Sequence, residues 1–335
     1  MSKRLDERMV LVLSIIVDNY IKYKQSDGSR VLTKRYQIEF SPATMRNVML
    51  DLEDAGYLTH THTSGGKIPT EKGYKFYLEM IMSNFSPNLK KDFENIVVNK
   101  GLGSLDEKMN KILNVASSLS GLVSLVTMPD FSRTKIKNIE FIKISEDKII
   151  CVVVSDTNMI DTRIVNLNKD ITEKELKEFS RYITENYKGW TLTDINNSIE
   201  SYIKNHKQEC ESIIKTLANQ TDKTKLLVSG VKNIFNYSSF NDDLNKLRKI
   251  VSVLEEKRAI VDILKGVMES DRKILIGNDF PIDELKDLGL VSSSYQYKNQ
   301  NVGVVGIMGP MNMNYKEMLN IVESAKKKIG DILNN

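Results

Sequence analysis

The hydrophobic positions near the start of the chain follow a helical period twice. Between residues 5 and 24, apolar side chains recur three and four positions apart, which predicts an amphipathic helix that stops at Asp27-Gly28. A second helix is expected to begin at Ser41, whose hydroxyl suits the N-cap, with Pro42 at the first helical position. The buried stripe of this second helix has the same spacing and consists of Met45, Val48, Met49 and Leu52.

After the second helix the pattern changes to that of a hairpin. Gly56 is typical of a helix stop, and Tyr57–Thr61 predicts a strand. Ser64–Gly66 predicts a tight turn, and the returning strand is expected at Lys67-Ile68. A short helix is also expected from Thr33, so the order is helix, helix, hairpin, which indicates a winged helix-turn-helix.

The outward face of the second predicted helix carries residues suited to DNA. Ala43 is small enough to let the backbone approach, and Arg46 and Asn47 can make paired hydrogen bonds to guanine and adenine edges. We predict DNA contacts from five residues of this helix: Ser41, Ala43, Thr44, Arg46 and Asn47. An Arg-Asn pair also occurs simply as a solvated helix face, but the glycine-tipped hairpin that follows favours DNA binding.

The tip of the hairpin has the composition of a phosphate-binding wing. Around Gly65 and Gly66 the chain offers hydroxyls, a cation and exposed backbone N–H groups. The predicted wing contacts are His62, Thr63, Ser64 and Lys67.

Composition limits how the chain can bind nucleic acid. The 335 residues include 48 Lys and Arg against 44 Asp and Glu, and a net charge of +4 is too small for a diffuse polycation. DNA binding must therefore be local. Cys151 and Cys210 share no metal or redox spacing, so buried thiols and a reducing cytoplasm are expected. No apolar run approaches the roughly 18 residues of a spanning helix, and no export or membrane segment is expected.

Enzymatic and metal-binding interpretations have little support. His60 and His62 share one face of a strand, but no third ligand of suitable type lies nearby in the sequence. The stretch Gly303–Pro310 lacks the Lys-Ser/Thr end of a phosphate loop, so its glycines are expected to serve strand packing and a turn. We predict no catalytic residues, no metal and no cofactor.

Beyond a predicted helix at 71–82 and a predicted linker at Ser86-Pro87-Asn88, the chain mixes strands and helices. Runs of β-branched residues predict an antiparallel meander of four strands: 122–127, 135–144, 148–155 and 159–167. Three later strands, followed by a helix with an apolar stripe, are expected at 273–277, 290–297 and 301–308. The polar, helical stretch between the two sets holds Trp190. These patterns predict an α+β domain interrupted in sequence.

Two motifs resemble one known family. The stretch SPATMRNVMLDLEDAGYLTHTHTSGGKIPTEKGYKFY is similar to the signature of the heat-inducible transcription repressor HrcA, and GVVGIMGPMNMNYKEMLNIVESA resembles the C-terminal motif of that family. The first motif departs from the family at four positions: Val48, Leu50, Gly65 and Lys67. In the second, Asn312 replaces an arginine. The departures concern operator preference and wing affinity rather than the class of function.

The resemblance implies an organisation and a mode of action. It implies a winged-helix domain at 1–86, a GAF-like α+β domain in two parts at 88–167 and 241–335, and an inserted helical dimerising segment at 168–240. It further implies a dimeric repressor that binds an inverted-repeat operator upstream of chaperone operons and depends on a GroEL-type chaperonin. The alternative is a winged-helix regulator controlled by a small ligand in the GAF-like domain.

Overall fold

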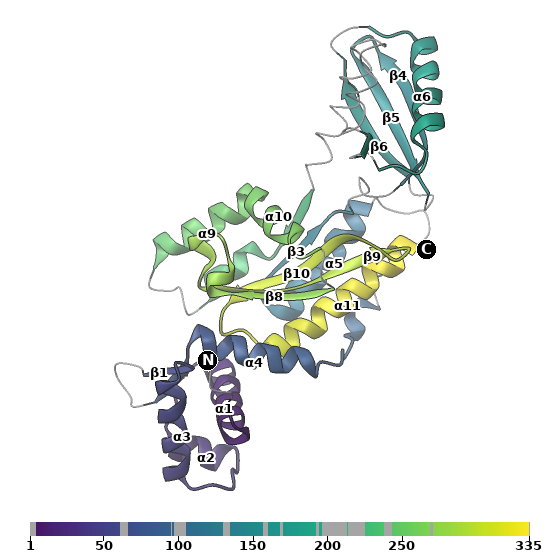
Figure 1. Ribbon diagram of the computed structural model, residues 1–335. Helices are drawn as coiled ribbons and strands as arrows, with labels where there is room; N and C mark the ends of the chain where they lie inside the picture. Colours follow the sequence, from purple (N-terminus) through teal and green to yellow (C-terminus); the bar gives the residue numbers. More distant parts are fainter. Residues whose placement is uncertain are drawn as a thin grey trace.

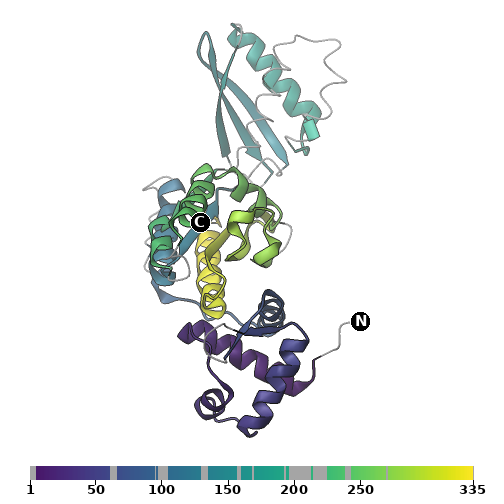
Figure 2. The same cartoon turned by 90° about the vertical axis from the view of Figure 1, so that its left-hand side faces the viewer.

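The chain forms three bodies that follow one another from end to end (Figures 1 and 2). The computed structural model describes residues 5–60, 66–94, 96, 105–129, 135–156, 160–167, 170–191, 194–195, 213, 225–237, 243–268 and 271–334. The helices of the first body stand at one end, a larger sheet domain lies in the middle, and a small sheet with one helix stands at the other end. The α+β prediction is confirmed.

The first body is a winged helix-turn-helix, as predicted. Its elements are α1 (Glu7–Tyr23), α2 (Ser29–Arg35), α3 (Pro42–Asp54), the strands β1 (Leu58–His60) and β2 (Lys67–Pro69), and α4 (Glu71–Ser83). The two strands pair antiparallel, with Thr59 opposite Ile68. The short helix α2 begins four residues before the predicted Thr33, because Gly28 already serves as its N-cap in an extended conformation.

The central domain is built on a five-stranded antiparallel sheet of order β7-β3-β10-β9-β8. Its strands are β3 (Val123–Thr127), β7 (Leu226–Ser229), β8 (Arg272–Ile276), β9 (Leu288–Tyr297) and β10 (Gln300–Pro310). Two helices pack side by side on one face, α5 (Leu105–Ser120) and α11 (Tyr315–Asn334). Beside the sheet, α9 (Leu244–Glu256) contacts the short turns Val231–Asn236 and Asp283–Leu285 and is followed by α10 (Arg258–Lys265).

The third body is an insert with its own core. It consists of a separate sheet of order β4-β5-β6 and a helix across one face: β4 (Ile136–Ser145), β5 (Lys148–Ser155), β6 (Ile160–Asn166) and α6 (Glu173–Tyr187). The ring of Phe141 stacks on that of Phe179, with centroids 5.0 Å apart, and the buried side chains of this body form a cluster separate from the rest of the protein.

The limits predicted for the insert, 168–240, therefore need correction. The expected four-stranded meander is divided between two sheets, because β3 pairs with β10 and β7 while β4, β5 and β6 pair only with one another. The insert starts after Thr127, not at 168. It ends before Leu226, because β7 returns to pair with β3. The described part of 168–240 is also not purely helical, since it includes β7.

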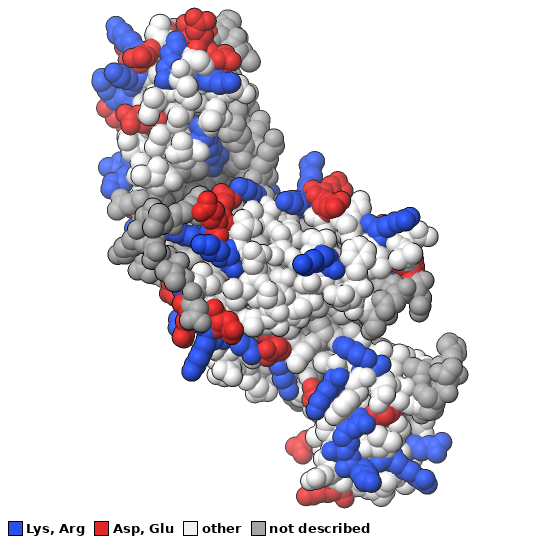
Figure 3. Space-filling view, turned by 180° about the vertical axis from the view of Figure 1, so that it is seen from behind, with Lys and Arg blue, Asp and Glu red and all other residues white. Residues whose placement is uncertain are grey.

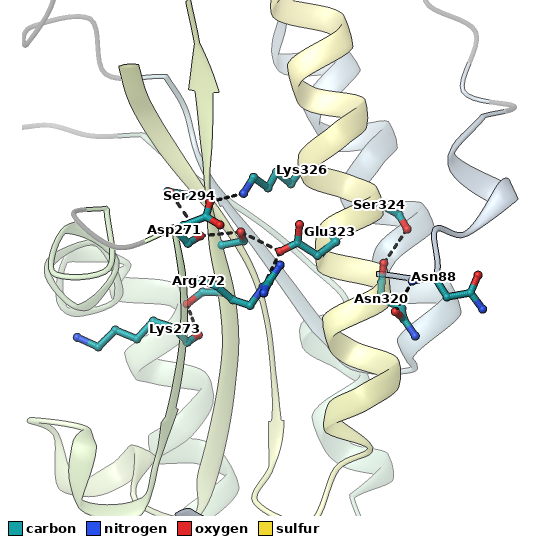
Figure 4. Close-up of polar contacts among 11 residues, drawn as sticks. Asn88, Asp271, Arg272, Lys273, Ser294, Asn320, Glu323, Ser324 and Lys326 are labelled. Carbon is teal, nitrogen blue, oxygen red and sulfur yellow. Dashed lines mark hydrogen bonds and ion pairs between the residues drawn. The ribbon is translucent and has the colours of Figure 1, made fainter. Parts of the chain in front are cut away.

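The predicted linker is held in place rather than free. The backbone N–H of Asn88 donates to Asn320 Oδ1 at 2.9 Å, and that of Lys90 donates to Ser324 Oγ at 2.8 Å. Figure 4 shows Asn88 beside α11, on which Glu323 also accepts a hydrogen bond at 2.9 Å from Arg272 of β8. The buried side chains of the winged helix and of the central domain form one continuous cluster.

Candidate DNA-binding surface

The outward face of α3 is exposed over its whole length. Ala43, Arg46, Asn47 and Leu50 are all exposed, and they follow one another at helical spacing. On the opposite face Met45 and Leu52 are fully buried, so the helix is held by its inner side and presents its outer side to solvent. This geometry is the one expected from the sequence for a helix that enters a major groove.

Both ends of α3 are fixed by local hydrogen bonds. At its start, Ser41 Oγ accepts from the backbone N–H of Thr44 at 3.1 Å and lies 3.0 Å from the Thr44 hydroxyl. At its end, Gly56 adopts φ +78° and donates to the carbonyl of Glu53 at 2.8 Å, while Tyr57 donates to that of Leu52 at 2.8 Å. Of the five predicted contacts on this helix, Ser41 and Thr44 therefore form its cap, and Ala43, Arg46 and Asn47 form its free outer face.

The turn between α1 and α2 is braced by a polar network. The guanidinium of Arg35 donates to Asn19 Oδ1 at 2.5 Å, forms an ion pair with Asp27, and lies 4.2 Å from the ring centroid of Tyr23. Asn19 is 2% exposed and donates to Asp27 at 3.0 Å. Because both atoms of the buried Asn19 amide have partners, the network fixes the position of α2 against α1. The position of α3, which packs on both helices, is fixed with it.

The wing is described only at its base. His62, Thr63 and Ser64 lie outside the described residues. The described Lys67 does not extend freely: its ammonium pairs with Glu53 near the end of α3, and its side chain is only 15% exposed. Glu53 also lies 3.1 Å from His60 Nδ1. The hydrogen bond from Lys67 is the main cause that lowers the pKa of the Glu53 carboxyl. In this structure Lys67 ties the base of the wing to α3.

Positive charge is concentrated around the helix-turn-helix. Residues 22–47 include six Lys or Arg and two Asp or Glu. Figure 3 shows Lys and Arg side chains gathered over the winged-helix domain on the face drawn there. Arg30 and Lys34 of α2 are exposed as well, and neither is among the DNA contacts predicted from the sequence. They lie four positions apart, on one side of α2. This spacing in the sequence favours phosphate contacts, because the first helix of a helix-turn-helix crosses the DNA backbone.

The described part of the chain offers no metal centre. Among those residues, no group of three or more His, Cys, Asp or Glu could hold a metal ion. The glycine-rich stretch Gly303–Pro310 lies within β10, as predicted, and a Cβ on Gly303 would meet the Tyr295 hydroxyl at 2.2 Å. Cys151 is buried. Of the helices in the described ranges, none combines the length and the apolar character needed to span a bilayer.

Comparisons with known proteins agree along almost the whole chain. Residues 106–319 match the family described as "HrcA protein C terminal domain". The heat-inducible transcription repressor HrcA of Thermodesulfovibrio yellowstonii is 31% identical over 340 residues, covering 97% of each chain. That of Natranaerobius thermophilus is 31% identical over 95% of this chain and 94% of its own. A crystal structure described as a hypothetical protein has the same fold, with a TM-score of 0.64 and 20% identity over 98% of this chain and 99% of that chain.

Proposed function

Because the chain belongs to the HrcA family of heat-inducible transcription repressors, we propose that it binds an inverted-repeat operator as a dimer and so blocks a chaperone operon. The chain is a transcriptional repressor and not an enzyme.

The observation that carries the proposal is the exposed outer face of α3. Arg46 and Asn47 stand on a helix whose two ends are capped and whose inner face is buried, so their side chains are presented on a rigid support. A guanidinium can donate two hydrogen bonds to guanine and an amide can pair with adenine, which gives base discrimination in the major groove. The exposed Arg30 and Lys34 of α2 then supply phosphate contacts that set orientation.

Support for a dimer comes from the insert. The face of its sheet that α6 does not cover carries β-branched apolar side chains in cross-strand rows, with Ile142 opposite Ile150 and Ile150 opposite Ile164. Ile142 is 47% exposed and Ile164 58% exposed. A flat apolar face of this kind is costly in water and suits association with a second copy about a two-fold axis. Such a dimer presents two α3 helices to an inverted repeat.

The same face supports control by a GroEL-type chaperonin. A monomer that has not yet paired exposes this apolar surface, and such surfaces are the aggregation-prone kind that chaperones bind. When heat-damaged proteins occupy the chaperonin, unpaired repressor accumulates and the operon is released. Release on heating agrees with the name of the relatives, which are described as heat-inducible transcription repressors.

A gel-shift titration tests the proposal. Full-length protein is titrated against an inverted-repeat duplex and against a scrambled duplex of the same composition, with and without chaperonin. We expect preferential binding of the inverted repeat by a dimer, with a larger active fraction when chaperonin is present. Equal affinity for both duplexes under both conditions would contradict the proposal. A thermal shift produced by a protein-free metabolite extract, with no effect of chaperonin, would favour the small-ligand alternative instead.

A further inference from the structure

Leu50 is the one large apolar residue on the outer face of α3, whose other exposed residues are small or polar. It follows Arg46 by four positions and Asn47 by three, so its side chain lies on the same stripe, and it is 43% exposed. The core does not use it, because the inner face of α3 is already filled by Met45 and its buried neighbours. A single exposed leucine is ordinary on a protein surface, but this one lies between Asn47 and Asp54 on the helix proposed to enter the major groove, where it would face base edges.

We propose that Leu50 contacts the C5 methyl group of a thymine in the operator. This inference rests on the proposed binding of DNA through α3. In the major groove, thymine presents its methyl group, and apolar side chains contact it there. Leu50 lies about 6 Å along the helix axis from Arg46, since each residue rises about 1.5 Å. With base pairs about 3.4 Å apart, the thymine should lie within about two base pairs of the base that Arg46 contacts.

The charges that follow on α3 limit how the helix can lie. Asp54 stands one turn beyond Leu50 on the same side, and both Asp51 and Asp54 are exposed. Carboxylates are repelled by phosphates, so the end of α3 must leave the groove while its first half lies deepest. Leu50 is then the last outward residue of the helix that can approach a base. One leucine between Asn47 and Asp54 is also too small an apolar area for a protein partner.

Replacement of thymine by uracil tests the inference, because it removes only the methyl group. The probe is a duplex selected from a random-sequence pool by the full-length protein. Each thymine is replaced in turn, and the dissociation constants of wild type and Leu50→Ala are compared. At one thymine in each half-site, loss of the methyl should weaken wild-type binding about fourfold and leave Leu50→Ala unchanged, as expected for one buried methyl-sized group.

Two control variants make the result specific. Leu11→Ala changes a leucine of similar exposure, 46%, on α1, and should keep the full uracil effect. Arg46→Ala should bind the duplex more weakly overall, and it should still lose affinity when the same thymine is replaced by uracil. If every thymine that responds to uracil responds equally in Leu50→Ala, the inference is wrong while operator binding stands. If wild type does not distinguish the selected duplex from a scrambled one, the proposed function fails and this inference fails with it.

Discussion

Two exposed surfaces at opposite ends of the molecule differ in chemical composition: one is polar and close to positive charge, and the other is mainly apolar. The outer face of α3 is polar and lies in a region rich in Lys and Arg, with Leu50 as its one large apolar residue. The uncovered face of β4, β5 and β6 is mainly β-branched and apolar, and its exposed isoleucines include Ile144 at 52% and Ile160 at 67%. The first surface suits base edges and phosphates, whereas the second suits a flat protein surface.

The two surfaces also differ in how they are connected to the central domain. The winged helix shares one buried cluster with that domain and is further tied to it by polar contacts. Glu71 accepts from Asn278 Nδ2 at 2.8 Å, and Lys75 pairs with Asp279 at 2.7 Å. The insert has a separate core. The position of α3 within one chain is therefore fixed by packing, while in the dimer proposed above the insert would set the distance between two α3 helices.

The largest expected effect comes from charging the face of the insert. The double variant Ile142→Asp and Ile164→Asp would place two carboxylates on the proposed dimer face of each copy. We expect a monomer in light scattering and a loss of operator affinity of about a hundredfold or more, because central apolar residues dominate such interfaces. Lys177→Asp, on the exposed side of α6, is the control and should stay dimeric. Monomeric protein with unchanged operator affinity would show that dimerisation is not needed.

Changes at the base-reading residues should have the next largest effect. Arg46→Ala and Asn47→Ala should each cost about 1 to 3 kcal/mol of specific binding per contacted base pair, and nonspecific binding should hardly change. Fluorescence anisotropy on operator and random duplexes measures both quantities. If affinity falls equally on the two duplexes, these side chains contact phosphates and not bases.

The ion pair between Lys67 and Glu53 at the base of the wing can be tested on its own. Because Lys67 is paired with Glu53, Lys67→Ala and Glu53→Gln should weaken operator binding by similar amounts, about 1 kcal/mol each, and the double variant by little more than either single one. The measurement is a double-mutant cycle with salt titrations. If Lys67→Ala alone lowers the salt dependence by about one unit of log–log slope per half-site, Lys67 is instead a phosphate contact.

The smallest effect is a pH dependence at the junction of the two domains. Burial lowers the pKa of Lys24 to about 8, and its ammonium donates to the carbonyl of Asn312. The folded pKa lies below the unfolded value, so the charged form is disfavoured in the folded state. The unfolding free energy should therefore rise as pH increases from about 8 to about 10.4. Denaturant unfolding of wild type and Lys24→Gln at both pH values measures this, and an equal pH response in both would exclude Lys24.

The helix-turn-helix could be predicted from sequence because its signals are local. The cap at Ser41, the stop at Gly56 and the buried stripe from Met45 to Leu52 each depend on neighbouring residues, and all three are confirmed. The exposure of Arg46 and Asn47 follows from the same helical period.

The limits of the insert could not be found in the same way, because strand pairing is a tertiary property. Val123–Thr127 is buried at every position, as befits a strand between two others, whereas buried and outward residues alternate along Lys148–Ser155. This difference in hydrophobic pattern is weak evidence that the two strands belong to separate sheets. The pairing of Lys67 with Glu53 was also hidden, because it joins residues on different elements that approach only after the hairpin folds.

The most direct test of the whole account is the spacing of the operator. Full-length protein is titrated against the inverted repeat and against the same half-sites separated by about five extra base pairs, half a turn of DNA. If two α3 helices are held at a fixed distance by the insert and by rigid packing of the winged helix, affinity should fall to that of a single half-site. It should recover in part when about ten base pairs are added. Equal affinity for all three duplexes would contradict a dimer with two fixed recognition helices.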